Sequence, residues 1–398
     1  MTDEKPPETK LPPSNVASLA AAKLKKARAR KIQPPPTDED DGRPLITLTR
    51  GKLPQILDAA DAALGERDPH LFDHFGRMVR LTDPEQNGSA LADLVQRKPG
   101  AILLREVTVA NLGDRLARAA AWQRWDARAG CYVTADVPVE VAQGVLARSG
   151  EWRHIPPLRG FVEAPTLRDD GSVFDAPGYD KASQLFFVGS RPAGYSTPCE
   201  TREHARDALE KLQAAFYDLP FVDEQDKAAA YAAVLTSLVR RVLPSAPLVG
   251  ITAPAPGTGK SLLADAISII ATGRRAAVLG LGKDDIEGDK RLTSALLAGD
   301  AVIAIDNVER PMFGDLICQA LTQPNIRIRP LGSGYLVSTP TNIMLMVTAN
   351  NLDVRGDLRR RVMLVRLDAR VERPELRRFT TDFLQEIARQ RGELVQAG

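Results

Sequence analysis

Short apolar runs in the C-terminal half of the chain predict the buried strands of a parallel sheet. Three runs stand out, at Leu248–Thr252, Ala301–Ile305 and Asn342–Thr348. A strand covered on both faces loses the alternation of apolar and polar positions, and these runs show little of it. Helices are expected between them, at Leu262–Thr272 and Asp284–Leu297. We therefore predict an α/β domain with a parallel sheet over residues 246–398, ending in a C-terminal helix.

The pattern differs upstream, where short helices and strands are mixed. We predict a smaller α+β domain over residues 46–165 and a turn-rich connector with helices over residues 166–245. The expected elements are the helices Lys52–Leu64, Thr108–Trp125, Thr201–Phe216 and Asp223–Leu243 and the strands Gly76–Leu81 and Ala101–Val107. Trp122, Trp125 and Trp152 are expected mainly in the core, although aromatic side chains also stack on unpaired bases.

Residues 1–45 are rich in proline and charge, which predicts a disordered tail. A basic stretch lies inside it, made of Lys23, Lys25, Lys26, Arg28, Arg30 and Lys31. Such a stretch is either an arm that binds DNA or a partner, or a tail that keeps the protein in solution. Both interpretations stay open on the sequence.

Composition and charge limit the number of domains and argue against a uniformly basic, disulfide-bonded or membrane-spanning protein. A length of 398 residues suits two or three domains, and a formal net charge of +2 requires any nucleic-acid surface to be a local patch. The three cysteines, Cys131, Cys199 and Cys318, are far apart, which fits a reducing cytoplasm. The sequence has no apolar run of membrane-spanning length, and its first residues are too polar for a signal peptide, so no membrane association is expected.

A phosphate-binding loop is the most specific motif. It follows the strand Leu248–Thr252 and reads Pro256-Gly-Thr-Gly-Lys-Ser-Leu262. Gly257 and Gly259 allow a tight turn whose N–H groups point inward, and Thr258 lies between them. Lys260 is predicted to reach the β- and γ-phosphates of ATP, and the Ser261 hydroxyl to hold Mg²⁺. Pro254 departs from the usual pattern, which has glycine at that position.

Two later strand ends supply the polar residues that such a loop needs. Asp306 and Asn307 follow the run Ala301–Ile305, and Asn350 follows Asn342–Thr348. A carboxylate that emerges from a buried strand beside the phosphates holds Mg²⁺, and we assign this role to Asp306. Asn350 is predicted to contact the γ-phosphate or the attacking water.

Three arginines follow in the segment Asp357-Leu-Arg-Arg-Arg361. A guanidinium that stabilises charge on the transferred phosphoryl group is a known component of such sites, and it commonly comes from a neighbouring subunit. Arg360 is the preferred candidate for this arginine finger, with Arg359 and Arg361 as rivals. A solvated basic helix face is the alternative.

In this order, the motifs GTGKS, AVIAIDN, VTANN and DLRRR resemble those of superfamily 3 helicases within the AAA+ ATPases. More narrowly, they are similar to the helicase half of primase–helicase proteins of phages, plasmids and integrated elements. The resemblance spans roughly residues 46–390 and implies a replicative DNA helicase that uses ATP and Mg²⁺ and assembles as a ring, usually a hexamer. Lys260 and Ser261 would be Walker A, Asp306 Walker B and Asn350 sensor 1.

The sequence departs from the family at the catalytic base. Asn307 stands where many AAA+ proteins have glutamate, so the residue that activates water is left open, with Glu309 nearby. The chain also has no primase segment of its own, which makes a separate primase or replication protein an expected partner.

A hairpin is predicted between Asp306 and Asn350, over Ile326–Ser338, with Gly332-Ser-Gly334 at its turn. Arg327 and Arg329 alternate with isoleucines and therefore face one side. By resemblance, a hairpin at this place lines the channel of the ring, so Arg327, Arg329 and Tyr335 are predicted to contact DNA.

Two other functions remain compatible with the motifs. One is an AAA+ loader or remodelling ATPase that binds DNA or a replication partner without unwinding. The other is an assembly protein that keeps a decayed nucleotide site, for which Pro254 and Asn307 argue; the intact set of Lys260, Ser261, Asp306 and Asn350 argues against it.

Overall fold

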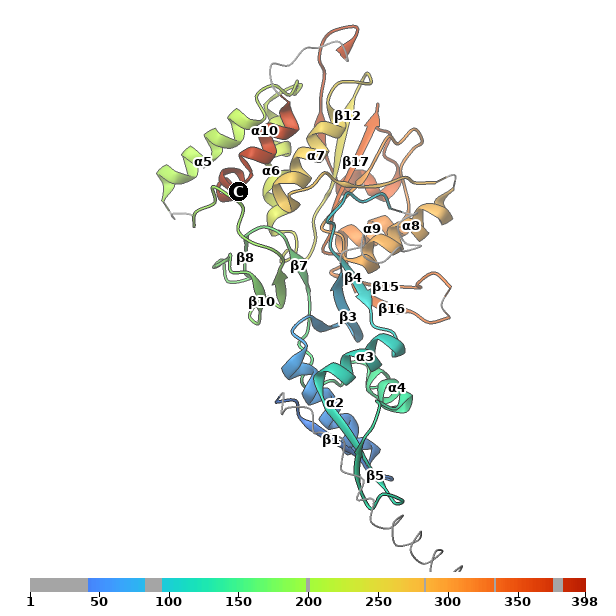
Figure 1. Cartoon of the computed structure of the whole chain (residues 1–398). Coiled ribbons are helices and arrows are strands. Elements are labelled where there is room, and N and C mark those ends of the chain that lie inside the picture. The colour runs from blue at the N-terminus through green and yellow to red at the C-terminus, as the bar shows by residue number, and fades with distance from the viewer. Residues whose placement is uncertain (1–41, 83–94, 198–200, 283, 333, 375–381) are drawn as a thin grey trace, which may run out of the picture.

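The computed structural model describes residues 42–82, 95–197, 201–282, 284–332, 334–374 and 382–398. These form a larger α/β body and a smaller N-terminal lobe that projects from it (Figure 1). The predicted tail lies almost entirely outside the described residues.

A five-stranded parallel sheet forms the centre of the α/β body. Its order is β13 (Ala277–Leu279), β14 (Val302–Ile305), β17 (Met344–Asn350), β12 (Leu248–Ala253) and β18 (Val362–Arg366). All four neighbouring pairs are parallel. The three strands expected from apolar runs are β12, β14 and β17, and the prediction of a parallel sheet is confirmed.

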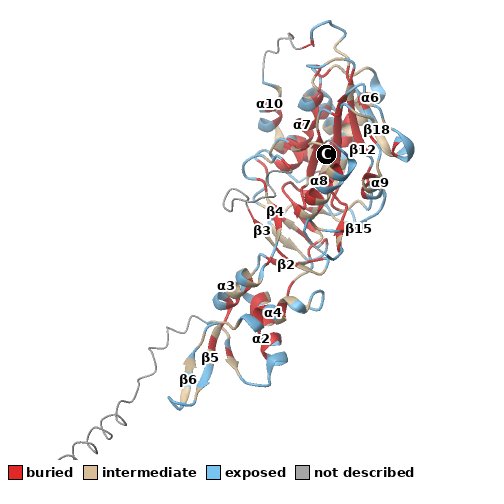
Figure 2. Ribbon diagram, turned by 90° about the vertical axis from the view of Figure 1, so that its right-hand side faces the viewer, coloured by how far each residue is buried: buried red, intermediate tan, exposed pale blue. Residues whose placement is uncertain are grey.

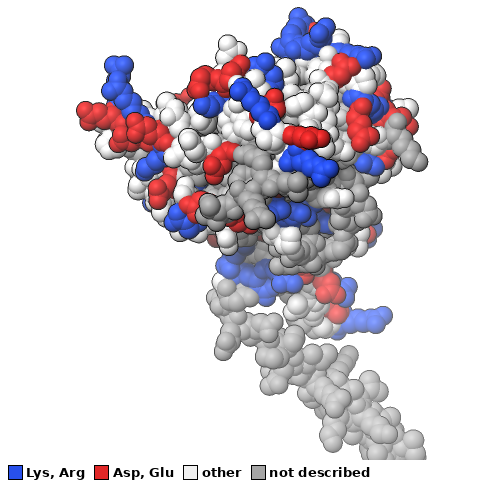
Figure 3. All heavy atoms as spheres, turned by 90° about the horizontal axis from the view of Figure 1, so that it is seen from above, with Lys and Arg blue, Asp and Glu red and all other residues white. Residues whose placement is uncertain are grey.

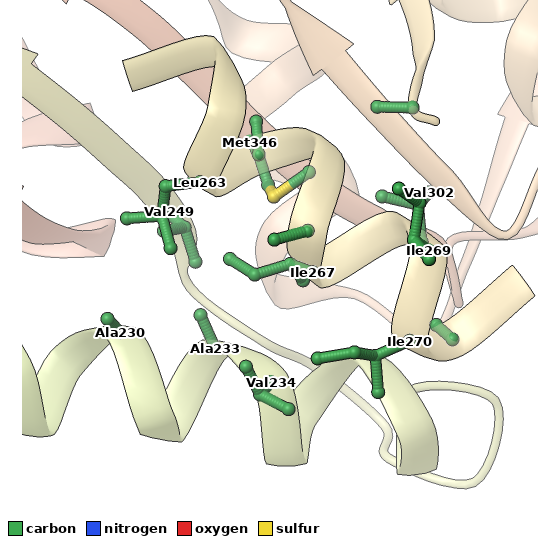
Figure 4. Close-up of a cluster of buried hydrophobic side chains, with 14 of the residues drawn as sticks. Ala230, Ala233, Val234, Val249, Leu263, Ile267, Ile269, Ile270, Val302 and Met346 are labelled. Carbon is green, nitrogen blue, oxygen red and sulfur yellow. The ribbon is translucent and has the colours of Figure 1, made fainter. Parts of the chain in front are cut away.

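Helices cover both faces of this sheet. The side chains of β12 alternate between two cores, with Val249 packed among one set of helices and Leu248 among the other. Figure 4 shows Val249 and Met346 of the sheet against Ile267 of α7 and Val234 of α6. One set comprises α6 (Glu224–Val239), α7 (Lys260–Thr272), α10 (Phe383–Arg389) and α11 (Arg391–Ala397), and the other α8 (Asp285–Ala298) and α9 (Asp315–Thr322). Because helices exclude water from both faces of the sheet, the strands carry apolar residues at nearly every position.

The predicted hairpin is present at the amino edge of the sheet. Strand β15 (Asn325–Ile328) pairs antiparallel with β16 (Val337–Pro340), which leads directly into β17. Ile326 and Ile328 are buried, whereas Arg327 and Arg329 are exposed, as their alternation predicts. Ser333 at the predicted turn lies outside the described residues.

The N-terminal lobe packs three helices against one face of a small sheet. Strand β5 lies between β1, which runs parallel to it, and β6, which runs antiparallel. Ile46 and Trp122 point from the sheet into the core of the lobe. The elements are β1 (Leu45–Leu48), α2 (Leu53–Arg67), α3 (Val109–Ala119), β5 (Ala121–Asp126), β6 (Cys131–Thr134) and α4 (Val139–Ala147).

The predicted helix Thr108–Trp125 is wrong in its second part. Helix α3 ends at Ala119, and the chain continues as β5. Pairing determines this strand: β1 is distant in sequence, and β6 follows β5 after a turn. The spacing of apolar residues within one segment gives no information about such partners. Trp122 is therefore a core residue of a strand, and its indole N–H donates to Leu116 O at 3.0 Å.

Short strands and one helix connect the lobe to the α/β body. Phe72 and Val79 pack with Leu104, Leu158 and Phe161 in a small core between the two parts. The connecting elements are β2 (Leu71–His74), β3 (Arg77–Thr82), β4 (Leu103–Glu106), β7 (Gly160–Val162), β8 (Thr166–Leu167), β9 (Val173–Phe174), β10 (Gly178–Asp180), β11 (Leu185–Phe187) and α5 (Arg202–Ala215).

A buried arginine joins these segments. Arg241 lies just after α6 and is 5% exposed. Its guanidinium donates to Gly299 O at 2.6 Å, to Phe161 O at 3.1 Å and to the Asn342 side chain at 3.0 Å. Burial lowers the pKa of Arg241 to about 10, so the group stays charged at neutral pH. One side chain thereby satisfies backbone carbonyls before β14, on β7 and before β17.

We expect Arg241→Met to destabilise the protein by about 3 kcal/mol, because it leaves several buried acceptors without a donor. The change should appear as a lower urea midpoint by circular dichroism. Arg118→Met is the matched control, since Arg118 is 78% exposed and pairs only with Asp114. Equal midpoints for the two variants would contradict the role given to Arg241.

Candidate functional site

The loop between β12 and α7 has the backbone conformation that its glycines allow. Gly257 has φ of 73° and Gly259 has φ of 110°, a region that other residues rarely adopt. Thr258 is buried, and its hydroxyl donates to Ala255 O at 2.8 Å, which holds the loop closed. Gly259 occupies the N-cap position of α7 and has no side chain to cap it. The first amides of α7 are therefore oriented to receive an anion.

Lys260 is held at the carboxyl edge of the sheet. Its side chain is largely buried, and its ammonium donates to Asn350 Oδ1 at 2.6 Å and to Ala255 O at 3.3 Å. Burial lowers the pKa of Lys260, and the neighbouring Asp306 carboxylate opposes that shift. The structure thus places the positive charge between the ends of β12 and β17.

The Asp306 carboxylate is the centre of a second set of contacts. Its Oδ1 accepts from Ser261 Oγ at 3.2 Å and from the Thr348 hydroxyl. Thr348 Oγ1 in turn accepts the backbone N–H of Asn307 at 3.0 Å. Thr348 is 1% exposed, so its hydroxyl fixes the carboxylate from the buried side and leaves Ser261 on the solvent side.

Strand order brings these residues together. Strand β17 lies between β12 and β14, and Asn350 is in register with Ala253 at the end of β12. In an open α/β sheet, ligands bind outside the carboxyl ends of the strands. Lys260, Ser261, Asp306 and Asn350 all lie at that edge, although they come from three separate parts of the sequence.

The donor set fits a nucleotide and a magnesium ion. The uncapped amides of α7 and the Lys260 ammonium suit phosphate oxygens. Ser261 Oγ and Asp306 Oδ1 are hard oxygen donors 3.2 Å apart, a spacing that two ligands of one small cation share. Gly257, Thr258 and Gly259 supply backbone N–H groups, while Pro256 and Leu262 flank the loop and are exposed.

Asn307 has a different environment from the other strand-end residues. It is exposed, with φ of 52°, and its side-chain amide donates to Glu309 Oε1 at 3.3 Å. Glu309 is the nearest carboxylate that this loop adds to the site. The amide of Asn307 cannot accept a proton as a carboxylate does, so the residue that activates water stays open.

The three arginines lie away from the phosphate loop of their own chain. They belong to the short 3₁₀ helix η3 (Gly356–Arg361), which ends where β18 begins. Arg360 pairs with Asp357 at 2.6 Å and remains 74% exposed, and Arg359 is also exposed. The start of β18 is the amino edge of the sheet, and a five-residue strand spans about 16 Å. These guanidinium groups therefore lie at the edge of the sheet opposite to the phosphate loop of the same chain.

The residues predicted to contact DNA also lie at the amino edge. Arg327 and Arg329 project from the hairpin, and Tyr335 is 59% exposed. Burial lowers the pKa of Arg77 on β3, while Glu106 and Tyr335 act in the opposite direction, which places Tyr335 beside the connecting sheet. The nucleotide residues and the hairpin thus occupy opposite ends of β17.

On the face of the α/β body seen from above, charges of the two signs are mixed. Lysine and arginine side chains are interspersed there with aspartate and glutamate (Figure 3). This agrees with the near-neutral net charge and leaves recognition of nucleic acid to local groups.

Thr348 is a site residue that the motifs did not identify. In the sequence it is one polar residue at the end of the apolar run Asn342–Thr348, two positions before Asn350. A hydroxyl in a strand that is otherwise apolar needs a buried partner, and this was the available signal. Its partner, Asp306, is far away in sequence.

Comparisons with known proteins reveal only remote similarity. No family model matches the chain, and no curated protein matches it significantly. Among solved structures, the apo A form of the NrS-1 C-terminal region aligns over 82% of this chain and 64% of that chain, at 11% identity and a TM-score of 0.38. A second apo structure of that region covers 73% and 69%, at 14% identity and 0.35.

A JCV helicase structure aligns over 41% of this chain and 46% of that chain, at 14% identity and a TM-score of 0.28. At these scores the similarities establish neither a shared activity nor a shared assembly. The chain also spans less than two thirds of the NrS-1 region in the first comparison. In the part of the chain that the structure describes, no helix combines the length and apolar character needed to cross a bilayer.

We expect Thr348→Val to weaken magnesium-dependent nucleotide binding about tenfold, because residues that orient a ligand of a cation commonly have effects of that size. Thr348→Ser keeps the hydroxyl and should restore affinity. Titration with a fluorescent ATP analogue, in Mg²⁺ and in EDTA, measures both. If Thr348→Val binds as the parent protein does in Mg²⁺, Thr348 does not position Asp306.

Proposed function

We propose that this chain is an ATP-dependent DNA helicase or translocase, acting as a ring in the replication of a mobile element. One observation carries the enzymatic part: Lys260, Ser261, Asp306 and Asn350 converge at the carboxyl edge of a parallel sheet. The resemblance of the motifs to superfamily 3 helicases supports the DNA-dependent part. The proposed units are the ATPase domain 246–398, the connector 166–245, the domain 46–165 and the tail 1–45.

In the proposed reaction, the chain's residues bind and neutralise the terminal phosphates of ATP. The amides of Gly257, Thr258 and Gly259 receive phosphate oxygens, and Lys260 exchanges its contact with Asn350 for the β- and γ-phosphates. Ser261 and Asp306 would hold Mg²⁺, which would supply charge neutralisation at the phosphates when bound. Asn350 is then released to orient the attacking water.

The proton acceptor for that water is proposed to be Glu309, with Asn307 holding it. Asn307 donates to Glu309 at 3.3 Å, so a carboxylate is tied to the loop that follows Asp306. Glu309 is exposed, which leaves it free to turn toward the phosphates. This assignment accounts for an asparagine in the position where relatives have an acid.

A second subunit is needed to complete the proposed site. Arg360, or its neighbour Arg359, lies at the amino edge of its own sheet and is exposed there. Supplied to the nucleotide of an adjacent subunit, it would stabilise charge on the transferred phosphoryl group. In a closed ring, expected to be hexameric, every subunit would receive an arginine from its neighbour in the same way.

The hairpin is the proposed link between hydrolysis and DNA. Strand β16 continues into β17, so the hairpin and Asn350 are attached to the two ends of one strand. Arg327 and Arg329 would contact phosphates, and Tyr335 would stack on a base. The alternative is an AAA+ loader or remodelling ATPase, which would hydrolyse ATP without displacing a strand; a separate primase or replication protein is a proposed partner in either case.

Lys260→Ala should abolish ATP turnover and strand displacement while the circular dichroism spectrum and urea midpoint stay close to those of the parent. The ammonium is the group that meets the terminal phosphates, so its loss removes the reaction and not the fold. Lys181→Ala, at an exposed turn, is the matched control.

Phosphate release and displacement on a forked duplex are the measurements. Retained turnover in Lys260→Ala would refute the site, whereas turnover without displacement in the parent protein would select the loader.

Arg329→Ala should weaken binding of single-stranded DNA equally for all sequences and lower the salt slope by about 0.7, the value for one phosphate contact. Arg389→Ala is the control, because Arg389 is 70% exposed on α10 and pairs with Glu386. Fluorescence anisotropy across a salt series measures the slope. An unchanged slope would remove Arg329 from the DNA path.

A further inference from the structure

Within the described residues, one face of the sheet in the N-terminal lobe has no helix packed on it. Helices α2, α3 and α4 pack on the face that carries Ile46 and Trp122. The opposite face carries Trp125 and Tyr132, which are 55% and 52% exposed. In Figure 2, β5 and β6 lie at the far end of the lobe and include exposed and half-buried residues. Large aromatic side chains are thus displayed to solvent on a rigid strand pair.

The two aromatic residues are direct neighbours across the sheet. Trp125 and Tyr132 are paired in register, with ring centroids 5.2 Å apart and planes at 75°. The other two tryptophans are tied into the lobe, because Trp122 donates to Leu116 O and Trp152 to Val145 O at 2.7 Å. The Trp125 ring is not part of the core of the lobe, so core packing does not explain why an aromatic residue occupies this position.

Polar groups on the same face suit the edges of bases. Thr47 and Gln123 lie beside each other in register, and Gln123 Nε2 donates to Thr47 Oγ1 at 2.8 Å. Thr134 is paired with Gln123 on the next strand and is exposed. The face therefore combines aromatic rings with uncharged donors and acceptors, and carries no carboxylate among these positions.

Basic side chains lie in the turns at the end of the sheet that carries the aromatic pair. Arg128 is in the β5–β6 turn, and Arg50 is in the turn after β1, whose last residue, Leu48, is in register with β5 next to Trp125. Both are exposed, and neither forms an ion pair with another residue in the described ranges. Asp126, at the end of β5, accepts the N–H groups of Arg128 at 2.7 Å and Ala129 at 3.2 Å and so is engaged in the turn.

We propose that the open face of the β1–β5–β6 sheet is a second binding site for single-stranded DNA, with Trp125 and Tyr132 stacking on bases and Arg50 and Arg128 contacting phosphates. Stacking needs bases whose faces are free, which single strands offer and duplexes do not. Arginines at the rim follow the backbone without reading sequence. The proposal relies on the proposed function only for the choice of ligand, since the sheet is separate from the nucleotide site.

The test is binding of fluorescein-labelled oligothymidylate to the full chain without nucleotide, by anisotropy. Trp125→Ala/Tyr132→Ala should weaken binding at least about tenfold, since each stacked base contributes a factor of that order. Trp125→Phe/Tyr132→Phe keeps two rings and should bind within about threefold of the parent. Tyr217→Ala is the matched control, because Tyr217 is 85% exposed elsewhere in the chain.

The experiment separates this proposal from the proposed function. ATP turnover without DNA should be equal in the parent and in Trp125→Ala/Tyr132→Ala, because neither ring is near Lys260. If the parent protein shows no ATP turnover, the proposed helicase function is wrong, but the comparison of DNA binding between the parent and the variants still tests the sheet proposal. DNA affinity within twofold of the parent for Trp125→Ala/Tyr132→Ala overturns the sheet proposal. A change in particle mass with unchanged DNA affinity would assign the face to protein contact and overturn it equally.

Discussion

The candidate nucleotide site depends on the parallel pairing of β17 between β12 and β14. This pairing sets Asn350 beside Ala253 and brings Asp306, at the end of β14, within reach of Ser261. Without it, the phosphate loop would be a glycine turn with a lysine and no acid. The apolar side chains of the three strands, covered by helices on both faces, stabilise the pairing and exclude water from behind the polar edge.

The same strand separates two kinds of chemistry. At its carboxyl end, Thr348 and Asn350 contact the acid and the ammonium that would handle phosphate. At its amino end, it continues from the hairpin that carries Arg327 and Arg329. Arg241 fastens the amino end by donating to Asn342 and Gly299. Because β17 is short and well packed, a displacement at one of its ends is transmitted to the other end.

Much of the α/β body followed from the sequence because its signals are local. Continuous apolar runs identified β12, β14 and β17, and glycine spacing identified the loop before α7. The chain's resemblance to helicases then ordered Lys260, Asp306 and Asn350 into one site, and the contacts of these side chains agree with that grouping. Their catalytic roles remain proposals.

The rest depended on contacts between distant residues. The sequence does not single out Thr348, because the partner of its hydroxyl follows another strand. Apolar spacing predicts a helix where β5 lies, because pairing with β1 and β6 determines that strand. Trp125 was expected in the core since a tryptophan in a globular segment is commonly buried; only the sheet's register shows that it faces outward. Side-chain direction in a strand depends on pairing, which spacing along one segment does not fix.

Calorimetric titration of the folded chain with a non-hydrolysable ATP analogue tests the central claim most directly. With Mg²⁺ present, we expect one nucleotide bound per chain, and with EDTA a much weaker or undetectable binding heat, because Ser261 and Asp306 act through the cation. Absence of binding in Mg²⁺, or equal affinity with and without it, would contradict a phosphate and magnesium site at the carboxyl edge of this sheet.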